Sequence, residues 1–164
     1  MNSINTPVAA PRAITLIPKQ KFENRRAIFN ELGGDLRRGI STSKKVNAIL
    51  LIRNEKEHYR NDFYSENNEK ILYIGIGNIG NQDDVKNNSD YNLNIEVFNH
   101  KRSKKKLIIF NKTSIGYEFL GEYKLSETHQ NTHPDINGNL RRVFVFHLER
   151  ISENCSLKLM KIEK

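Results

Sequence analysis

The apolar residues of this chain fall into short runs of strand length, and this pattern limits the folds that it can adopt. Each run is rich in β-branched or aromatic residues, which favour strands. Glycine, asparagine or proline separates most runs from the next, as in turns. The runs are Ala13 to Ile17, Asn47 to Ile52, Ile71 to Ile76, Leu107 to Phe110, Tyr117 to Leu125 and Val143 to Leu148. They predict a mainly β fold with one or two helices (α+β), an open β-barrel or pseudobarrel rather than a parallel α/β sheet.

Two segments carry helical signals. Phe22 to Leu32 has apolar side chains near helical spacing and is followed by Gly33-Gly34, a common helix end. Leu93 to Lys106 is expected to hold a second helix that fades into Lys and Arg. Ser126 to Arg142 is rich in Asn, Gly and Pro, so we expect a long turn-rich connection between the last two strands.

The chain has 164 residues, enough for one domain with its own core. We expect a single pseudobarrel domain over 21–164, preceded by an N-terminal arm over 1–20 that packs on it or leads into it. Cys155 is the only cysteine, which excludes an intrachain disulfide and favours the reducing cytoplasm. The N-terminus does not resemble a signal peptide, and no apolar run is long enough to span a membrane.

The charge of the chain favours a polyanionic partner. Its formal net charge is +8 and its pI is about 9.6. The charge is uneven, because residues 1–60 and 99–164 are basic whereas residues 61–98 are acidic. This pattern fits a domain with one cationic face better than a uniformly basic tail.

A glycine-punctuated loop from Gly33 to Lys45 combines cations with hydroxyl groups. Glycine lets a backbone approach its partner closely, while Arg, Lys, Ser and Thr supply the contacts that DNA phosphates and base edges require. An ordinary solvated loop after a helix is the alternative interpretation. The candidate DNA-binding residues of this loop are Arg37, Arg38, Ser41, Thr42, Ser43, Lys44 and Lys45.

The segment Gly75 to Gln82 superficially matches a dinucleotide-binding fingerprint. Asp83 and Asp84 disfavour that interpretation, because they put negative charge where a phosphate-binding helix should begin. We interpret the segment as a second recognition loop, since Asn and Gln amides can read adenine bidentately. A simple hairpin turn is the alternative. The candidate residues are Asn78, Asn81 and Gln82.

A third cationic feature is the segment Asn99 to Lys106, which holds five cations. It is either a solvated turn or a loop that contacts phosphates, and in the second case its contribution to binding would depend strongly on salt. The candidate residues are Lys101, Arg102, Lys104, Lys105 and Lys106.

Catalytic motifs are weak in this sequence. His129 and His133 have the spacing of zinc ligands on a helix, but Pro134 disfavours a helix there. A small nuclease using Asp62, Asp83 and Asp84 is a rival interpretation that lacks a fixed geometry. We therefore predict no catalytic residues, no cofactor and no metal site.

The order of the motifs resembles the pseudobarrel DNA-recognition domains of bacterial restriction endonucleases, in particular SRA-like domains beside HNH nuclease modules. That family tends to show a glycine-arginine loop ending in Gly-Ile-Ser, then Tyr-Thr-Gly-Glu-Gly-x-x-Gly-Asp, Leu-x-Leu-Phe, Gly-x-[Phe/Tyr] and Pro-Asp-x-x-Gly-x-x-Arg. The resemblance covers about Phe22 to Leu148. The matching segments are Arg37 to Ser41, Tyr73 to Gln82, Leu107 to Phe110, Gly121 to Tyr123 and Pro134 to Arg142.

This chain departs from the family pattern at Ile76, where the family has Glu, and at Asn81, where it has an acidic residue. A plant-type B-three-like pseudobarrel, which grips the major groove with two arms, fits the same loops. The SRA-like alternative implies a modified-base reader that flips a base, and the B-three-like alternative implies direct contacts in the groove.

These patterns predict a non-catalytic, site-specific domain that binds double-stranded DNA in a restriction system and reads bases through two loops. Sensitivity of this binding to cytosine methylation is a further expectation. A nuclease or motor domain or subunit would supply cleavage, and the chain would be part of that larger assembly. Two rivals besides the nuclease are a protein-interaction barrel and an RNA-binding barrel. The RNA-binding barrel would stack bases on exposed aromatic residues. Its candidates are Tyr59, Phe63, Tyr64 and Tyr73.

Overall fold

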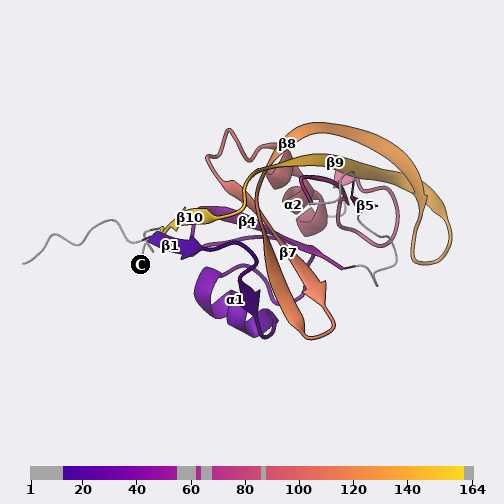
Figure 1. Ribbon diagram of the computed structural model, residues 1–164. Coiled ribbons are helices and arrows are strands. Elements are labelled where there is room, and N and C mark those ends of the chain that lie inside the picture. The colour runs from indigo at the N-terminus through magenta and orange to yellow at the C-terminus, as the bar shows by residue number, and fades with distance from the viewer. Residues whose placement is uncertain (1–12, 55–61, 64–67, 86–87, 161–164) are drawn as a thin grey trace, which may run out of the picture.

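A computed structural model describes residues 13–54, 62–63, 68–85 and 88–160 of the chain. Strands dominate, and two helices accompany them, which confirms the mainly β α+β prediction (Figure 1). The helices are α1 (Arg25–Leu32) and α2 (Asn88–Phe98). The strands are β1 (Ala13–Leu16), β2 (Lys21–Phe22), β3 (Ile40–Thr42), β4 (Ala48–Arg53), β5 (Asp62–Phe63), β6 (Lys70–Ile74), β7 (Lys106–Thr113), β8 (Gly116–Pro134), β9 (Leu140–Ser152) and β10 (Cys155–Lys158).

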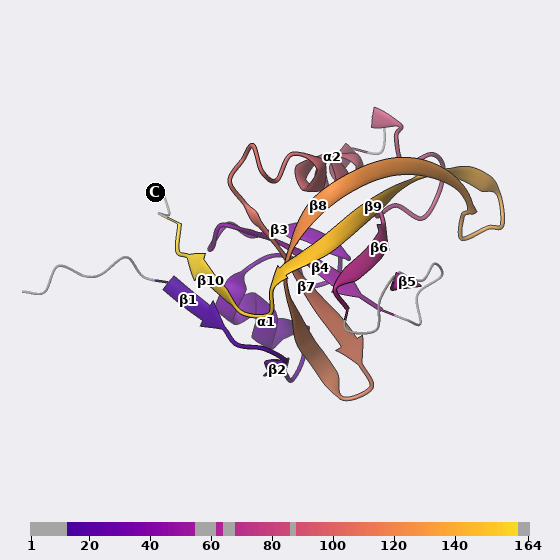
Figure 2. The ribbon, with the colours of Figure 1, turned by 45° about the horizontal axis from the view of Figure 1, so that its top comes forward.

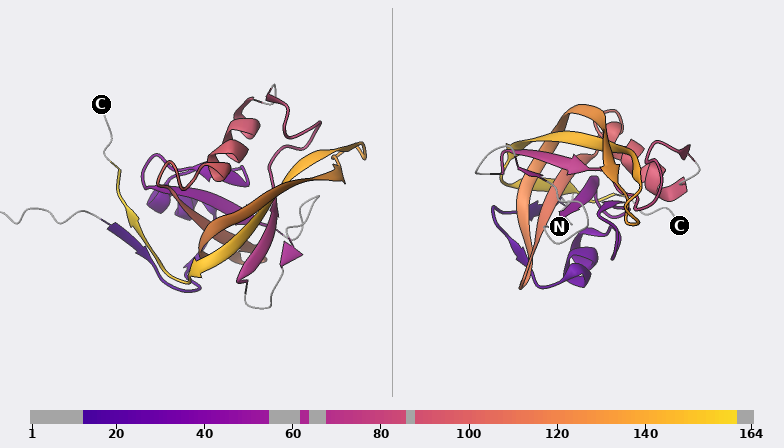
Figure 3. Two further views of the ribbon diagram at one scale, coloured as in Figure 1. Left: turned by 90° about the horizontal axis from the view of Figure 1, so that it is seen from above. Right: turned by 90° about the vertical axis from the view of Figure 1, so that its right-hand side faces the viewer.

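An eight-stranded sheet forms the body of the domain. Its order is β3-β4-β7-β8-β9-β6-β5, and β2 pairs with β8 beside this path. The sheet curls strongly, as the view from its right-hand side shows (Figure 3). Its two ends, β3 and β5, do not pair with each other within the described residues, so the sheet is an open pseudobarrel rather than a closed barrel.

The centre of the sheet is buried on both faces. In β4 every residue is buried. Leu50 and Ile52 belong to the core cluster that contains the α1 side chain Ile28, whereas Ile49 and Leu51 belong to the cluster on the α2 side. Burial on both faces explains why β4 reads as a continuous apolar run, and β4 pairs in parallel with β7, as strands of that kind often do.

Both helices differ from the sequence predictions at their ends. Helix α1 starts at Arg25 because the Asn24 side chain caps it, accepting the Ala27 N–H at 2.9 Å, while Phe22 lies in β2. Helix α2 covers 88–98, not 93–106. The chain after α2 forms a separate turn, and the last predicted helical residue, Lys106, is the first residue of β7.

The connection predicted between the last two strands is wrong for most of its length. Strands β8 and β9 pair over a long antiparallel ribbon that arches over the body (Figure 2). The residues of 127–134 continue β8, because each is paired with a residue of β9. Only residues 135–139 form the turn, where the Asp135 carboxylate accepts the N–H groups of Asn137 and Asn139 at 2.8 and 2.9 Å.

The N-terminal strand β1 lies beside the C-terminal strand β10. Strand β1 pairs antiparallel with β10 in a two-stranded ribbon beside the body (Figure 3, left). Residues 1–12 of the predicted arm lie outside the described residues. Within the described part of the chain, neither helix has the length and apolar character needed to cross a membrane.

Candidate nucleic-acid interface

Loop 33–45 begins where α1 ends. Gly33 has φ of 79° and donates its N–H to the Phe29 carbonyl at 2.8 Å. A Cβ at this position would lie 2.7 Å from the Ser43 hydroxyl oxygen, and the positive φ also disfavours other residues. Glycine therefore lets the two ends of the loop approach each other closely.

The tip of this loop is organised by Asp35. Its carboxylate accepts the backbone N–H groups of Arg37 and Arg38 at 2.6 and 3.0 Å. Partial burial raises the pKa of Asp35, but these hydrogen bonds and the charges of Arg38 and Arg25 outweigh it, so the pKa lies below its ordinary value. The turn leaves the side chains of Leu36 and Arg37 exposed.

Two residues of the loop that the sequence predicts to contact DNA form hydrogen bonds within the protein instead. Ser41 is buried, and its hydroxyl oxygen accepts the Asp35 N–H at 3.0 Å. Ser43 is also buried, donates to the Leu32 carbonyl at 2.5 Å and accepts the Val46 N–H at 2.9 Å. The structure therefore does not favour DNA contacts by either serine, because the Ser41 hydroxyl bonds within the loop and the Ser43 hydroxyl bonds to the end of α1.

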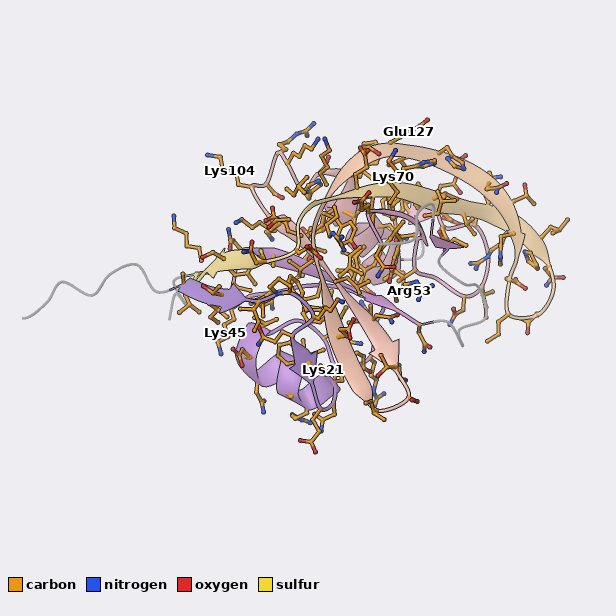
Figure 4. All side chains as sticks on the ribbon, in the orientation of Figure 1. Lys21, Lys45, Arg53, Lys70, Lys104 and Glu127 are labelled. Carbon is orange, nitrogen blue, oxygen red and sulfur yellow. The ribbon has the colours of Figure 1, made fainter. Side chains whose placement is uncertain are left out.

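The remaining predicted residues of the loop differ in how they are held. Thr42 donates its hydroxyl to the Glu96 carboxylate on α2. Lys45 donates from Nζ to the Asn30 carbonyl at 2.8 Å (Figure 4). Lys44 is exposed. Of these three, Lys44 has the side chain that is most accessible to a phosphate.

Gln82 stabilises the second loop, 75–84, from within. Only 1% of this residue is exposed. Its Nε2 donates to the carbonyls of Gly75 and Gly77 at 2.6 and 3.3 Å, and its Oε1 accepts the Phe144 N–H at 2.8 Å. The predicted base contact is therefore corrected for Gln82, since its amide joins this loop to β9.

The two asparagines of the second loop have different surroundings. Asn81 accepts the Arg142 N–H on its side-chain oxygen at 2.8 Å and so pins the loop to β9. Asn78 accepts the Ile136 N–H on its backbone carbonyl at 3.0 Å, while its side chain is exposed. Of the three predicted amides, Asn78 is the one that the fold presents at the surface.

Charged residues of β9 complete the attachment of this loop. Arg142 pairs with Asp83, with Nε–Oδ2 at 3.0 Å, and Gln130 donates to the same carboxylate at 3.1 Å. The hydrogen bond from Arg142 is the main reason that the pKa of Asp83 lies below its ordinary value. The buried Arg141 donates to the Gly77 carbonyl at 2.5 Å. Asp83 thus has a structural role, which weakens the nuclease interpretation.

The structure describes only some of the residues on which the rival interpretations depend. Tyr73 is 2% exposed, so it offers no stacking surface to RNA. Tyr59, Tyr64 and the side chains of Asp62 and Phe63 lie outside the described residues. No group of three His, Cys, Asp or Glu side chains within the described ranges is placed to hold a metal ion.

The two loops meet at one cavity of about 480 Å³. Arg37, Arg38 and Gly39 line it from the first loop, and Ile76, Gly77 and Asn78 line it from the second. Its wall includes the Tyr73 hydroxyl group, which lies 2.9 Å from the Gly39 carbonyl and 2.7 Å from that of Ile52. The cavity therefore lies between the two segments that the sequence singled out.

Five further polar residues line this cavity and were missed by the sequence reasoning: Arg25, Asn54, Asp90, Lys112 and Tyr117. Arg25 donates from Nη2 to the Arg38 carbonyl at 2.6 Å, and burial lowers its pKa. The sequence offered one signal for Arg25: a cation in the first turn of a helix opposes the helix dipole, which indicates that it serves another purpose there. Lys112 and Tyr117 come from β7 and β8 and carry no comparable signal.

The turn after α2 carries the third cationic feature. His100 is buried at its start, and its Nε2 accepts the Leu125 N–H at 3.2 Å while Nδ1 lies 3.0 Å from the Lys105 carbonyl. Burial lowers the pKa of this histidine, which favours the neutral ring that these two bonds require. His100 thus anchors the turn to β8.

The five cations of this turn divide into two groups. Lys105 lies 4.0 Å from Glu96, and Lys106 lies 3.8 Å from Glu122 and donates to the Ser156 carbonyl at 2.9 Å. Both are therefore partly neutralised. The other three are exposed: Lys101, Arg102 and Lys104. None of the ion pairs between described residues involves them. Figure 4 shows Lys104 pointing into solvent.

Solved structures share this fold at low sequence identity. The sulfur-binding and SRA domains of ScoMcrA, complexed with phosphorothioated DNA, match with a TM-score of 0.63 at 18% identity, over 83% of this chain and 40% of that one. The SUVH5 SRA domain with hemi-methylated CG DNA matches with a TM-score of 0.61 at 18% identity, over 91% and 94%. The modification-dependent TagI restriction endonuclease matches with a TM-score of 0.57 at 19% identity, over 82% and 49%.

The chain thus spans less than half the length of the ScoMcrA and TagI chains. A comparison with curated proteins found no match. The family model of the ScoMcrA-like SRA domain matches residues 18–158, which is most of the chain. This match decides between the two pseudobarrel types that the motifs left open. The chain belongs to the ScoMcrA-like SRA domain family.

Proposed function

We propose that this domain recognises double-stranded DNA for a modification-dependent restriction system and that another domain or subunit cleaves it. One observation carries the proposal: the cation-bearing loop 33–45 and the amide-bearing loop 75–84, far apart in the sequence, line the same cavity. Among the described residues, four cations line it, Arg25, Arg37, Arg38 and Lys112, against one carboxylate, that of Asp90. Such a charge balance attracts a polyanion.

The printed descriptions of the structural relatives support the nature of the ligand. ScoMcrA and SUVH5 are described in complexes with DNA, and TagI is described as a modification-dependent restriction endonuclease. Because the present chain has their fold and its own cationic cavity, we infer that its partner is also DNA that carries a modification.

The exposure of the side chains suggests separate roles for them. Arg37, Arg38 and Asn78 line the cavity and are the candidates for base edges, since Arg pairs with guanine and Asn with adenine. Lys44 and the cations of the turn after α2 would hold phosphates and set the register of the duplex. The buried Ser41, Ser43 and Gln82 have no place in this set.

A modified-base reader that takes the base into the cavity is a second candidate. Its volume of about 480 Å³ lies within the range of about 300–1,000 Å³ that is typical of ligand pockets. Isoleucine, tyrosine and arginine side chains line it, a combination that provides apolar contacts and hydrogen-bond donors for a base.

Selection from a random duplex library, with and without cytosine methylation, tests the function. We expect enrichment of a short motif and a difference between the two libraries. Arg37→Ala and Arg38→Ala should relax the preference by about 1–3 kcal/mol per lost bidentate contact. The matched control is Arg26→Ala, a neighbouring exposed arginine that does not line the cavity. Equal binding of all sequences, or unchanged selectivity in both cavity variants, would contradict the proposal.

A further inference from the structure

A second depression lies next to the cavity, between loop 33–45 and helix α2. It is wider, with a volume of about 1170 Å³. One wall comes from the loop, including Arg38, Thr42 and Lys44, and the other comes from α2 and the turn after it, including Asn92 and Arg102. We call it the side groove. Arg38 is the residue that lines both the side groove and the cavity.

Three cations line the side groove: Arg38, Lys44 and Arg102. Arg38, Lys44 and Arg102 take part in none of the ion pairs formed among the residues that the structure describes. Lys101 and Lys104 extend the positive charge along the turn that bears Arg102. Positive charge thus lies on both walls.

The carboxylates of the side groove are already engaged. Asp35 accepts the N–H groups of Arg37 and Arg38, as described above. Glu96 accepts the Thr42 hydroxyl and lies 4.0 Å from Lys105 Nζ. Both negative charges are therefore directed toward groups of the protein, and the cations remain for a ligand.

We propose that the side groove binds the phosphodiester backbone of DNA that flanks the site held at the cavity. This proposal rests on the proposed function. Three observations support it: cations on opposite walls, neutral polar side chains such as Asn92 and Asn99 on the wall formed by α2 and the turn after it, and continuity with the cavity through Arg38. Serine and asparagine side chains are common partners of phosphate oxygens, which suits contacts that are independent of sequence.

The test compares two duplexes with the same central site. The short duplex ends at the footprint of the cavity, and the long duplex continues for one helical turn on each side. Affinities are measured by fluorescence anisotropy over a range of salt concentrations for the full chain and for the double variant Lys44→Gln with Arg102→Gln. Both side chains are exposed, so the fold should tolerate their replacement, which thermal unfolding verifies. The control is Lys21→Gln with Lys124→Gln, an equal charge change at exposed lysines that line neither depression.

We expect the double variant to lose affinity for the long duplex only. Affinity for the long duplex falls as salt rises from about 50 to about 200 mM. Without two phosphate contacts, the fold decrease in affinity over this range should be about tenfold smaller. Equal losses on both duplexes, no loss on either, or the same loss in the control would overturn the proposal. Polyglutamate is tested as a competitor. If the double variant weakens this competition but binds the long duplex as before, the groove is assigned to an acidic polypeptide. That result would also overturn the proposal. If the unaltered chain binds neither duplex, the proposed function fails as well.

Discussion

Loops 33–45 and 75–84 meet at the same cavity, but they are held in place in different ways. The first is held largely by its own residues, since Asp35 and Ser41 bond within the loop and Ser43 bonds to the end of α1. The second is held by its own Gln82 and also by side chains of β9, about sixty positions away in the sequence, among them Arg141 and Arg142. The comparison teaches that equally polar loops can be preorganised by local or by distant partners.

The largest effect is expected when the internal support of the second loop is removed. Gln82→Leu would leave the Gly75 carbonyl and the Phe144 N–H without their present partner. Because a buried unpaired group costs about 1–3 kcal/mol, we expect a loss of about 3 kcal/mol in the free energy of unfolding. Urea denaturation measures it.

The exposed Asn78 of the same loop serves as the control for this change. Asn78→Ala should alter stability by less than about 0.5 kcal/mol. Similar losses in the two variants would show that Gln82 does not support the loop in the way described.

A smaller effect is expected in the first loop. Ser43→Ala removes the hydroxyl bonds to the Leu32 carbonyl and to the Val46 N–H. We expect a loss of about 2 kcal/mol, since the loop retains its bonds to Asp35. Amide hydrogen exchange should become faster at Val46. Lys44→Ala is the matched control, and a stability change there as large as in the serine variant would contradict the local account.

The smallest effect concerns the ion pair that ties the second loop to β9. The pKa of Asp83 is lowered in the fold, so the pair stabilises the protein above the ordinary carboxyl pKa and is lost as the pH falls through the folded value. Because Arg142 is exposed and Asp83 is only partly buried, Asp83→Asn should cost less than about 0.5 kcal/mol near neutral pH.

Thermal unfolding at several pH values checks this prediction. The difference between the two proteins should vanish in acid and shrink in high salt. A difference that persists at low pH would mean that Asp83 acts through packing and not through its charge.

Much of the fold could be predicted, because strands and the first helix leave local signals. The continuous apolar run of β4 and the glycines after α1 are examples. The ribbon over 126–134 was missed because its residues are polar and exposed, and only pairing with β9 makes them a strand. Helix α2 was misplaced because its end depends on the turn that His100 anchors to β8.

By itself, the sequence determined the mainly β architecture, the basic character and the two loops that carry most of the candidate residues. These follow from the spacing of apolar residues and from charge, which are properties of the chain alone. The tertiary structure decided which side chains of those loops are accessible, since Ser43 and Gln82 become buried only when α1 and β9 pack against them. It also decided that the loops share a cavity with Arg25, because curling of the sheet brings together residues that are distant in sequence.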